Sequence, residues 1–268
     1  MKFFLQFFPE QLLTGIFFAV IISVVSFRFK LLSFSGSVAT FLLATVIYGI
    51  GGWKWTVPIL TFFIVSSLLS KFGKSRKKKF EIVFDKTDKR DAGQVAANGG
   101  VGGIIILIWY FFPERTALYY FYLASLAAVT ADTWGTEIGT LWKGKPRSII
   151  SLKKVEPGTS GAISLQGIVG GIVGAFIVLL SVVAMNDSEF TVQVIAAIIF
   201  SGFVGSLADS ILGATLQAQY QTSDGVLTEK KFANGEPTTF IRGFRWMNND
   251  GVNWMCALAG ALTMYLVM

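Results

Sequence analysis

The stretch LYYFYLASLAAVTADT (residues 118–133) is an apolar run that ends in an aspartate, Asp132. A second run, VQVIAAIIFSGFVGSLADS (residues 192–210), ends in nearly the same way at Asp209. An ionised carboxylate at the edge of an apolar helix costs several kcal/mol unless it has a partner. Because the chain carries this feature twice, we expect both aspartates to have a function. Carboxylate oxygens suit Mg²⁺, so the sequence predicts Mg²⁺ as their shared partner.

The composition indicates a membrane protein. The chain has 268 residues, and 53% of them are hydrophobic, which is typical of a polytopic membrane protein rather than a soluble domain. It contains no histidine, which excludes histidine acid–base catalysis and histidine metal sites. Its single cysteine, Cys256, excludes an intrachain disulfide. We expect the lipid bilayer as a partner and no nucleic acid.

Apolar segments predict an all-α transmembrane bundle of about eight spans, several of them short and Gly-rich, in a single domain covering residues 1–268. Gly49, Gly51 and Gly52 mark a turn inside the second apolar region, although fewer and longer helices around 33–70 are an alternative. The N-terminus has no clear cleavage site and is expected to be retained. The expected spans are 9–27, 33–52, 54–70, 98–112, 117–133, 161–185, 191–213 and 251–268.

The basic residues predict the orientation of these spans. If the short loop with Arg28 and Lys30 and the loops 71–92, 134–160 and 214–250 are cytoplasmic, 20 of the 23 basic residues lie inside, as the positive-inside rule requires. Both termini would then lie outside, and the acidic loop at 186–189 would lie outside with them. Asp132 and Asp209 fall at the cytoplasmic ends of their spans. A site that is reached from the cytoplasm follows from this layout.

Polar residues before the fourth predicted span form one candidate phosphate-binding group. Arg90, Gln94 and Asn98 recur at every fourth position, so a helix places them on one face. They lead into a glycine-rich run. A seam of small residues that packs helices together is an equally good interpretation of this run.

Glu137 is a further candidate metal ligand, but it lies about 140° from Asp132 on an unbroken helix. It reaches the same site only if the helix breaks near Gly135 or if Glu137 faces a neighbouring helix. An ion pair with Lys143 or Lys145 is the alternative.

A candidate phosphate-binding turn follows the next basic residues. Lys153 and Lys154 precede a Pro-Gly turn signal at Gly158, and Thr159 or Ser160 is expected to cap the next helix. A helix N-terminus beside lysines favours anions. An ordinary loop-to-helix cap is the alternative.

Asn249 and Asp250 stand at the start of the last span, where they suit either a ligand role or an N-cap.

These groups together indicate phosphoryl or nucleotidyl transfer to a lipid. In-line phosphoryl transfer depends on positioning and charge neutralisation. An alcohol acceptor needs a base, which only a carboxylate or lysine supplies in a chain without histidine. A phosphate monoester is already anionic near neutral pH. The composition therefore favours a lipid phosphate as the acceptor.

Four motifs in order resemble the phytyl-phosphate kinase-like integral membrane family, over about residues 10–265. They are Arg90 to Gly100 (RDAGQVAANGG), Ala131 to Gly139 (ADTWGTEIG), Pro157 to Ser164 (PGTSGAIS) and Gly205 to Ser210 (GSLADS). The resemblance implies phosphoryl transfer from a nucleoside triphosphate, with CTP favoured, to an isoprenyl phosphate of the phytyl or geranylgeranyl type.

A more distant likeness reaches polyprenol and phytol kinases and CDP-lipid synthases. The kinases have a Lys-Ser-x-Glu-Gly-Ser/Thr stretch. This chain keeps Lys154, Glu156, Gly158 and Thr159 but lacks the serine and gains Pro157. The likeness implies Lys154 as a catalytic residue and Glu156 in phosphate binding.

Two other functions remain open from the sequence. A CDP-lipid-forming cytidylyltransferase would use the same groups. A non-enzymatic lipid or ion transporter would also explain paired intramembrane carboxylates, although the polar residues gather on one side. The oligomeric state is left open.

Overall fold

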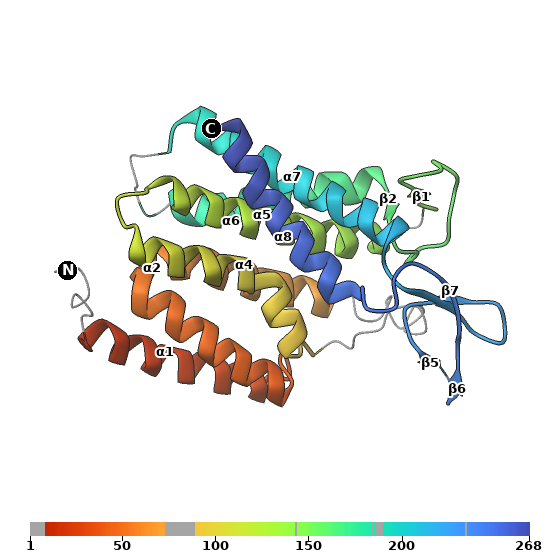
Figure 1. Ribbon diagram of the computed structural model, residues 1–268, viewed down its shortest axis with the longest axis horizontal. Helices are drawn as coiled ribbons and strands as arrows, with labels where there is room; N and C mark the ends of the chain where they lie inside the picture. The colour runs from red at the N-terminus through yellow and green to blue at the C-terminus, as the bar shows by residue number, and fades with distance from the viewer. Residues whose placement is uncertain (1–8, 73–88, 143, 184, 186–189, 234) are drawn as a thin grey trace.

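The computed structural model describes residues 9–72, 89–142, 144–183, 185, 190–233 and 235–268 (Figure 1). The described chain is mostly helical. Five of its helices, α1, α2, α4, α6 and α7, are long and apolar enough to cross a membrane. The helices are α1 (Pro9–Arg28), α2 (Phe34–Phe72), α4 (Ala92–Phe111), α5 (Ala117–Leu141), α6 (Leu165–Val183), α7 (Val192–Thr215) and α8 (Asn249–Val267).

Short strands in two loops modify the all-α expectation. The loop between α5 and α6 holds an antiparallel pair, and the loop between α7 and α8 holds a three-stranded and a two-stranded sheet. These strands give the loops backbone hydrogen bonds outside the helical bundle. They are β1 (Arg147–Ser148), β2 (Ala162–Ile163), β3 (Gln219–Gln221), β4 (Leu227–Thr228), β5 (Phe232–Ala233), β6 (Glu236–Pro237) and β7 (Thr239–Arg242).

The predicted loop at 134–160 begins too early. Helix α5 continues to Leu141, because Gly135 and Gly139 pack against Gly167 of α6 and keep the polar end of α5 inside the bundle. The fall in hydropathy after residue 133 therefore marks a polar helix surface and not the end of a helix. Most of the loop at 71–92 lies outside the described residues. The acidic loop at 186–189 lies outside them entirely.

Helix α2 reverses direction at Gly52. Gly52 has φ +61° and ψ −152°, a conformation open almost only to glycine. Arg90 is hydrogen-bonded through its backbone to Ser33, just before α2 begins, while its guanidinium lies over Phe62 and Phe63. The Arg90 carbonyl also lies against Gly36, near the start of α2. In a straight helix, Gly36 and Phe63 would be about 40 Å apart. The two halves of α2 therefore match the predicted spans 33–52 and 54–70, and eight crossings remain the prediction from sequence.

Helix α5 is the centre of the bundle. It packs against α2, α4, α6, α7 and α8, and all its residues from Leu123 to Ala131 are buried. Glycines on the neighbouring helices allow this close approach. A Cβ on Gly171 of α6 would lie 2.8 Å from the carbonyl oxygen of Ala131, and one on Gly260 of α8 would lie 2.7 Å from that of Ala124. The glycine seam of α6 is therefore packed against α5.

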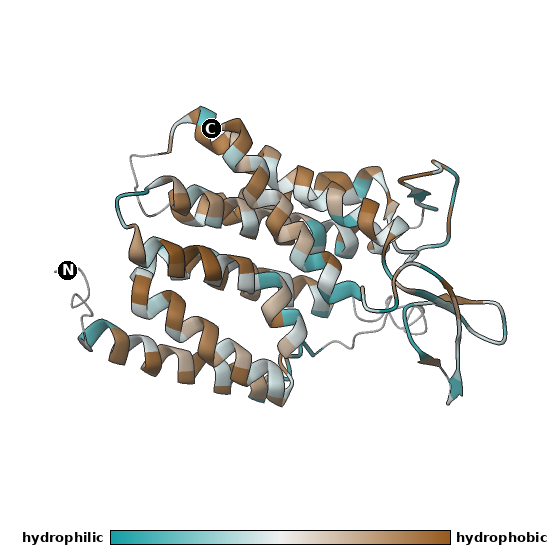
Figure 2. Cartoon of the chain, in the orientation of Figure 1, coloured by the Kyte–Doolittle hydropathy of each residue, from teal (hydrophilic) through white to brown (hydrophobic). Residues whose placement is uncertain are grey.

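The bundle has one polar end. The start of α1 and the end of α8 lie at one end, and the strands lie at the other (Figure 1). Hydrophilic residues gather at the strand end, whereas the middle of the bundle is mainly hydrophobic (Figure 2). This arrangement agrees with a multi-pass membrane protein whose polar loops lie on one side.

We predict that Gly52→Ala destabilises the protein by about 1–3 kcal/mol, because an L side chain is strained at this φ and ψ. The unfolding midpoint in mild detergent measures the change. Gly144→Ala is the matched control, since its Cβ would meet nothing within 4 Å. Equal midpoints for the two variants would contradict a tight reversal at Gly52.

Candidate functional site

A polar cavity of about 630 Å³ lies at the strand end of the bundle. Its wall combines the polar ends of α5, α6 and α7 with the starts of α4 and α8 and with the two strand-bearing loops. We call it the polar cavity. The sequence-predicted residues that line it are Arg90, Gln94, Asn98, Asp132, Glu137, Gly158, Thr159, Ser160, Asp209 and Asn249.

The two aspartates meet in this cavity. The side chains of Asp132 and Asp209 lie within hydrogen-bonding range of each other. One helical turn before them, Gly205 of α7 has no room for a Cβ because Ala128 of α5 is in contact with it. Helices α5 and α7 both run toward the strand end of the bundle (Figure 1). One further turn therefore brings both aspartates to the same height.

The aspartate pair has unmet bonding capacity. Asp209 Oδ2 is buried and has no hydrogen-bond partner among the described residues. Two carboxyl groups this close cannot both carry a full charge away from bulk water unless a cation or a proton lies between them. The pair therefore fits a divalent cation that prefers oxygen ligands.

Glu137 does not join the aspartate pair. Within the described ranges, no three acidic, histidine or cysteine side chains cluster closely enough to hold a metal. Helix α5 does not break, so Glu137 faces α2 and the start of α4 instead. The Ser70 hydroxyl donates to Glu137 Oε1, and Glu137 interacts electrostatically with Arg90. Lys143, one of the alternative partners, lies outside the described residues, and Lys145 pairs with Glu156.

Arg90 holds a positive charge on the wall of the cavity. Its removal from bulk water lowers its pKa to about 10, and the negative charge of Glu137 opposes that shift. Since its pKa remains well above 7, the guanidinium is charged at neutral pH. Arg90 and Lys230 are the basic side chains that line the polar cavity in the described part of the chain.

The Gly158–Ser160 turn lies on the cavity wall but does not cap the next helix. The N–H of Gly167 donates to the Ser164 hydroxyl, so Ser164 takes the capping role that was expected for Thr159 or Ser160. Ser160 instead donates toward Gln217 Oε1 (3.1 Å) and Glu229 Oε1 (2.9 Å). The turn is thus tied to the loop after α7. The strand pair at 147–163 separates it from α6.

The lysines next to this turn point away from the cavity. Lys153 and Lys154 are exposed and do not line it. Lys154 pairs through its backbone with Arg147. Glu156 is also exposed, and its carboxylate is 2.5 Å from Lys145 Nζ. The hairpin that carries these residues directs them to solvent, so the geometry places Lys154 and Glu156 outside the candidate site.

The starts of α4 and α8 supply amide groups to the wall. Asp91 caps α4 in a capping box with Gln94, and Asn98 Nδ2 donates to the Gln94 carbonyl oxygen (2.8 Å). Arg90, Gln94 and Asn98 therefore share a helix end, as predicted, although the helix begins at Ala92. Asn248, one residue earlier than expected, caps α8.

Because Asn248 is the cap, neither Asn249 nor Asp250 caps α8. Asn249 lies on the cavity wall. Asp250 lies against Gly93 of α4 and does not line the cavity.

Several polar residues of the cavity were not predicted as site residues, and Gln217, Glu229 and Lys230 are among them. Gln217 is 3% exposed, and its amide nitrogen has no hydrogen-bond partner within the described residues. Glu229 acts electrostatically on Asp209. All three lie in the long loop after α7. The only signal in the sequence was that this loop is polar. The strands that fold the loop back over the cavity could not be predicted from that polarity.

We predict that Asp209→Asn raises stability by roughly 1 kcal/mol in the absence of divalent cations. The amide removes the repulsion between two adjacent carboxyl groups and can donate a hydrogen bond to Asp132. The unfolding midpoint in detergent with a chelator measures this. Glu114→Gln changes an exposed glutamate in the loop between α4 and α5, which does not line the polar cavity, and it is the control. A midpoint below that of the control would contradict mutual repulsion within the pair.

Comparison with known proteins places the chain in a family. The model for the family described as integral membrane protein DUF92 matches residues 17–261. The chain is 29% identical to Protein PGR of Arabidopsis thaliana, over 90% of this chain and 92% of that protein. It is 30% identical to an uncharacterised membrane protein of Methanocaldococcus jannaschii, over 77% of this chain and 84% of that protein.

A more distant relative is the chloroplast protein VTE6 of Arabidopsis thaliana. It is 23% identical, over 88% of this chain and 65% of that protein. No solved structure matches the chain. The family model covers most of the sequence and includes every residue that lines the polar cavity. The chain therefore belongs to the DUF92 family of integral membrane proteins.

Proposed function

We propose that this protein is a membrane isoprenyl-phosphate kinase. It would transfer a phosphoryl group from a nucleoside triphosphate, with CTP favoured, to an isoprenyl phosphate. The products would be the isoprenyl diphosphate and the nucleoside diphosphate. The observation that carries the proposal is the Asp132–Asp209 pair in a polar cavity at the end of a membrane bundle. The resemblance of four motifs to the phytyl-phosphate kinase-like family supplies the donor and acceptor classes.

Asp132 and Asp209 would hold Mg²⁺. The fit rests on their two adjacent carboxyl groups and on Asp209 Oδ2, which is buried without a hydrogen-bond partner among the described residues. When bound, Mg²⁺ supplies charge neutralisation to the transferred phosphoryl group and the leaving diphosphate.

The chain's own residues would position the two phosphate-bearing substrates. Arg90 and Lys230 carry positive charge on the cavity wall, and Gln217 offers an amide donor from a buried position. An oxygen of the acceptor phosphate would attack the γ-phosphorus, and the bond from that phosphorus to the β-phosphate oxygen would break. Since the acceptor phosphate is already anionic, no general base is needed, which suits a chain without histidine. The leaving group is the nucleoside diphosphate.

The loops that cover the cavity would face the cytoplasm. This part of the proposal rests on the positive-inside count and on the gathering of hydrophilic residues at the strand end (Figure 2). A cytoplasmic opening gives access to nucleoside triphosphates.

The reaction is tested with purified protein, geranylgeranyl phosphate, and CTP that carries distinguishable labels on its α- and γ-phosphates. We expect the γ-phosphate label in the lipid product. Asp132→Asn should lower kcat/KM by about 100-fold or more, because it removes one of the two carboxylates that would hold Mg²⁺. Glu114→Gln should have the activity of the unaltered protein.

The label also separates the alternatives. An α-phosphate label in the lipid, with release of pyrophosphate, would identify a cytidylyltransferase. Lipid movement across proteoliposomes without nucleotide, together with no labelled product from any donor, would identify a transporter. Either outcome would contradict the kinase.

Metal binding has a readout that is independent of activity. We expect Mg²⁺ to raise the unfolding midpoint of the unaltered protein by an amount that grows with its concentration. Asp209→Asn should lose this increase, whereas Glu114→Gln should keep it. An equal increase in all three proteins would show that the cation binds elsewhere.

A further inference from the structure

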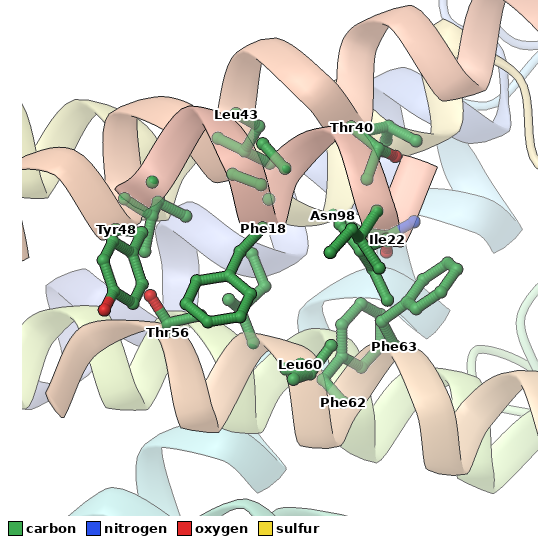
Figure 3. A pocket seen from close by; sticks show the side chains of 18 of the residues that line it. Phe18, Ile22, Thr40, Leu43, Tyr48, Thr56, Leu60, Phe62, Phe63 and Asn98 are labelled. Atoms are coloured by element: carbon green, nitrogen blue, oxygen red, sulfur yellow. The ribbon is translucent and has the colours of Figure 1, made fainter. Parts of the chain in front are cut away.

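A second cavity lies beside the polar one and is apolar. It measures about 230 Å³ and is bounded by α1, both halves of α2 and the first turns of α4. In Figure 3, Tyr48 and Thr56 stand at one end of it, and Asn98, Phe62 and Phe63 stand at the other, with Phe18 and Leu60 between them. We call it the apolar groove. The reversal of α2 at Gly52 creates it, because it brings the two halves of α2 to opposite sides of one space.

The groove and the polar cavity share one part of their walls. Arg90, Gln94 and Asn98 line both spaces. Arg90 is the charged residue among the lining side chains of the groove. The groove is thus apolar along its length and cationic where it reaches the candidate site. Such a space fits an amphiphile with a hydrocarbon tail and an anionic head.

The side chain and the backbone of Arg90 are both held in place where the groove meets the polar cavity. Its guanidinium carbon lies 5.4 Å from the ring centroid of Phe62 and 5.5 Å from that of Phe63, within cation–π range. Its backbone is fixed on both sides, since its N–H donates to the Leu31 carbonyl and its carbonyl accepts from Ser33 N–H, each at 3.0 Å. Glu137 balances its charge from the side of the polar cavity. A guanidinium has five N–H donors, so one carboxylate leaves donors for a phosphate.

The outer side of the groove belongs to the membrane. Helix α1 packs mainly against α2 at the edge of the bundle, and its outer residues Phe17 and Val24 are 61% and 54% exposed (Figure 1). A tail that enters from the bilayer would therefore cross apolar surface all the way to Arg90. A single chain suits a groove of about 230 Å³.

We infer that the apolar groove binds the tail of a single-chain isoprenyl phosphate and that Arg90 binds its phosphate. This inference rests on the proposed function. It assigns the acceptor to the α1–α2 side of the protein and leaves the nucleotide to the α6–α8 side of the polar cavity.

Photolabelling without nucleotide tests the binding directly. The probe is geranylgeranyl phosphate with a diazirine on its second isoprene unit, and the labelled residues are found by mass spectrometry. We expect labels on residues such as Phe18, Leu60 and Phe63, and about tenfold weaker labelling by the matching alcohol, which lacks the charge that Arg90 binds. Equal labelling by the alcohol, or equal competition by a two-chain phosphatidic acid, would overturn the inference.

Filling the groove tests its role in the reaction. Ala44→Phe adds a ring to the lining, whereas Val38→Phe adds one to the exposed side of the same helix. We expect Ala44→Phe to raise the KM for geranylgeranyl phosphate about tenfold, because the ring displaces part of the tail. The KM for CTP and the turnover of a five-carbon isoprenyl phosphate should stay unchanged, as should all parameters of Val38→Phe.

The two experiments fail separately. Labels in the groove with no kinase activity on any acceptor would contradict the proposed function and leave the binding site standing. Kinase activity with labels only on the outer faces of the helices, and no effect of Ala44→Phe, would overturn the groove and leave the kinase standing.

Discussion

The close contact between α5 and α7 is the constraint on which the candidate site depends. Gly205 lies against Ala128 with no space for a side-chain carbon between them, and the aspartates follow one turn later on each helix. Any larger residue at Gly205 would push the helices apart and separate the two carboxyl groups. The favourable packing of the buried core therefore offsets the unfavourable approach of two acids.

The second organising feature is Arg90, which links two spaces of opposite character. Its charge faces Glu137 in the polar cavity, and its flat face lies on the rings of the apolar groove. A reaction between a water-soluble nucleotide and a membrane lipid needs such a junction, because its substrates come from different solvents. The fold provides the junction by reversing α2 and by tying the start of α4 to the start of α2.

Local signals were reliable where a single residue type decides a local conformation. Gly52 was expected to mark a turn, and its positive φ explains why the chain reverses there. The helical spacing of Arg90, Gln94 and Asn98 correctly placed them together. The predicted positions of the helix caps were wrong by one to a few residues. Ser164 and Asn248 cap α6 and α8, although neighbouring residues are equally able to cap.

Long-range placement in the loops was beyond local signals. Lys154 and Glu156 resemble a kinase motif in sequence, yet the hairpin of β1 and β2 leaves both exposed. Gln217 and Lys230 gave no motif, yet the loop after α7 carries them onto the cavity wall. Glu137 was a candidate to join Asp132 only if α5 broke near Gly135 or if Glu137 faced a neighbouring helix. Helix α5 is unbroken and directs Glu137 toward Arg90.

Sequence patterns are enough to identify this chain as a multi-pass membrane protein with its polar groups at one end. Hydropathy and the distribution of basic residues are properties of single segments in contact with lipid or water, so they can be read without knowing how segments pack. The tertiary structure alone decided which polar residues share a wall and that an apolar groove meets them at Arg90. Those facts depend on contacts between helices far apart in the chain, which are set by the fit of glycine and alanine surfaces.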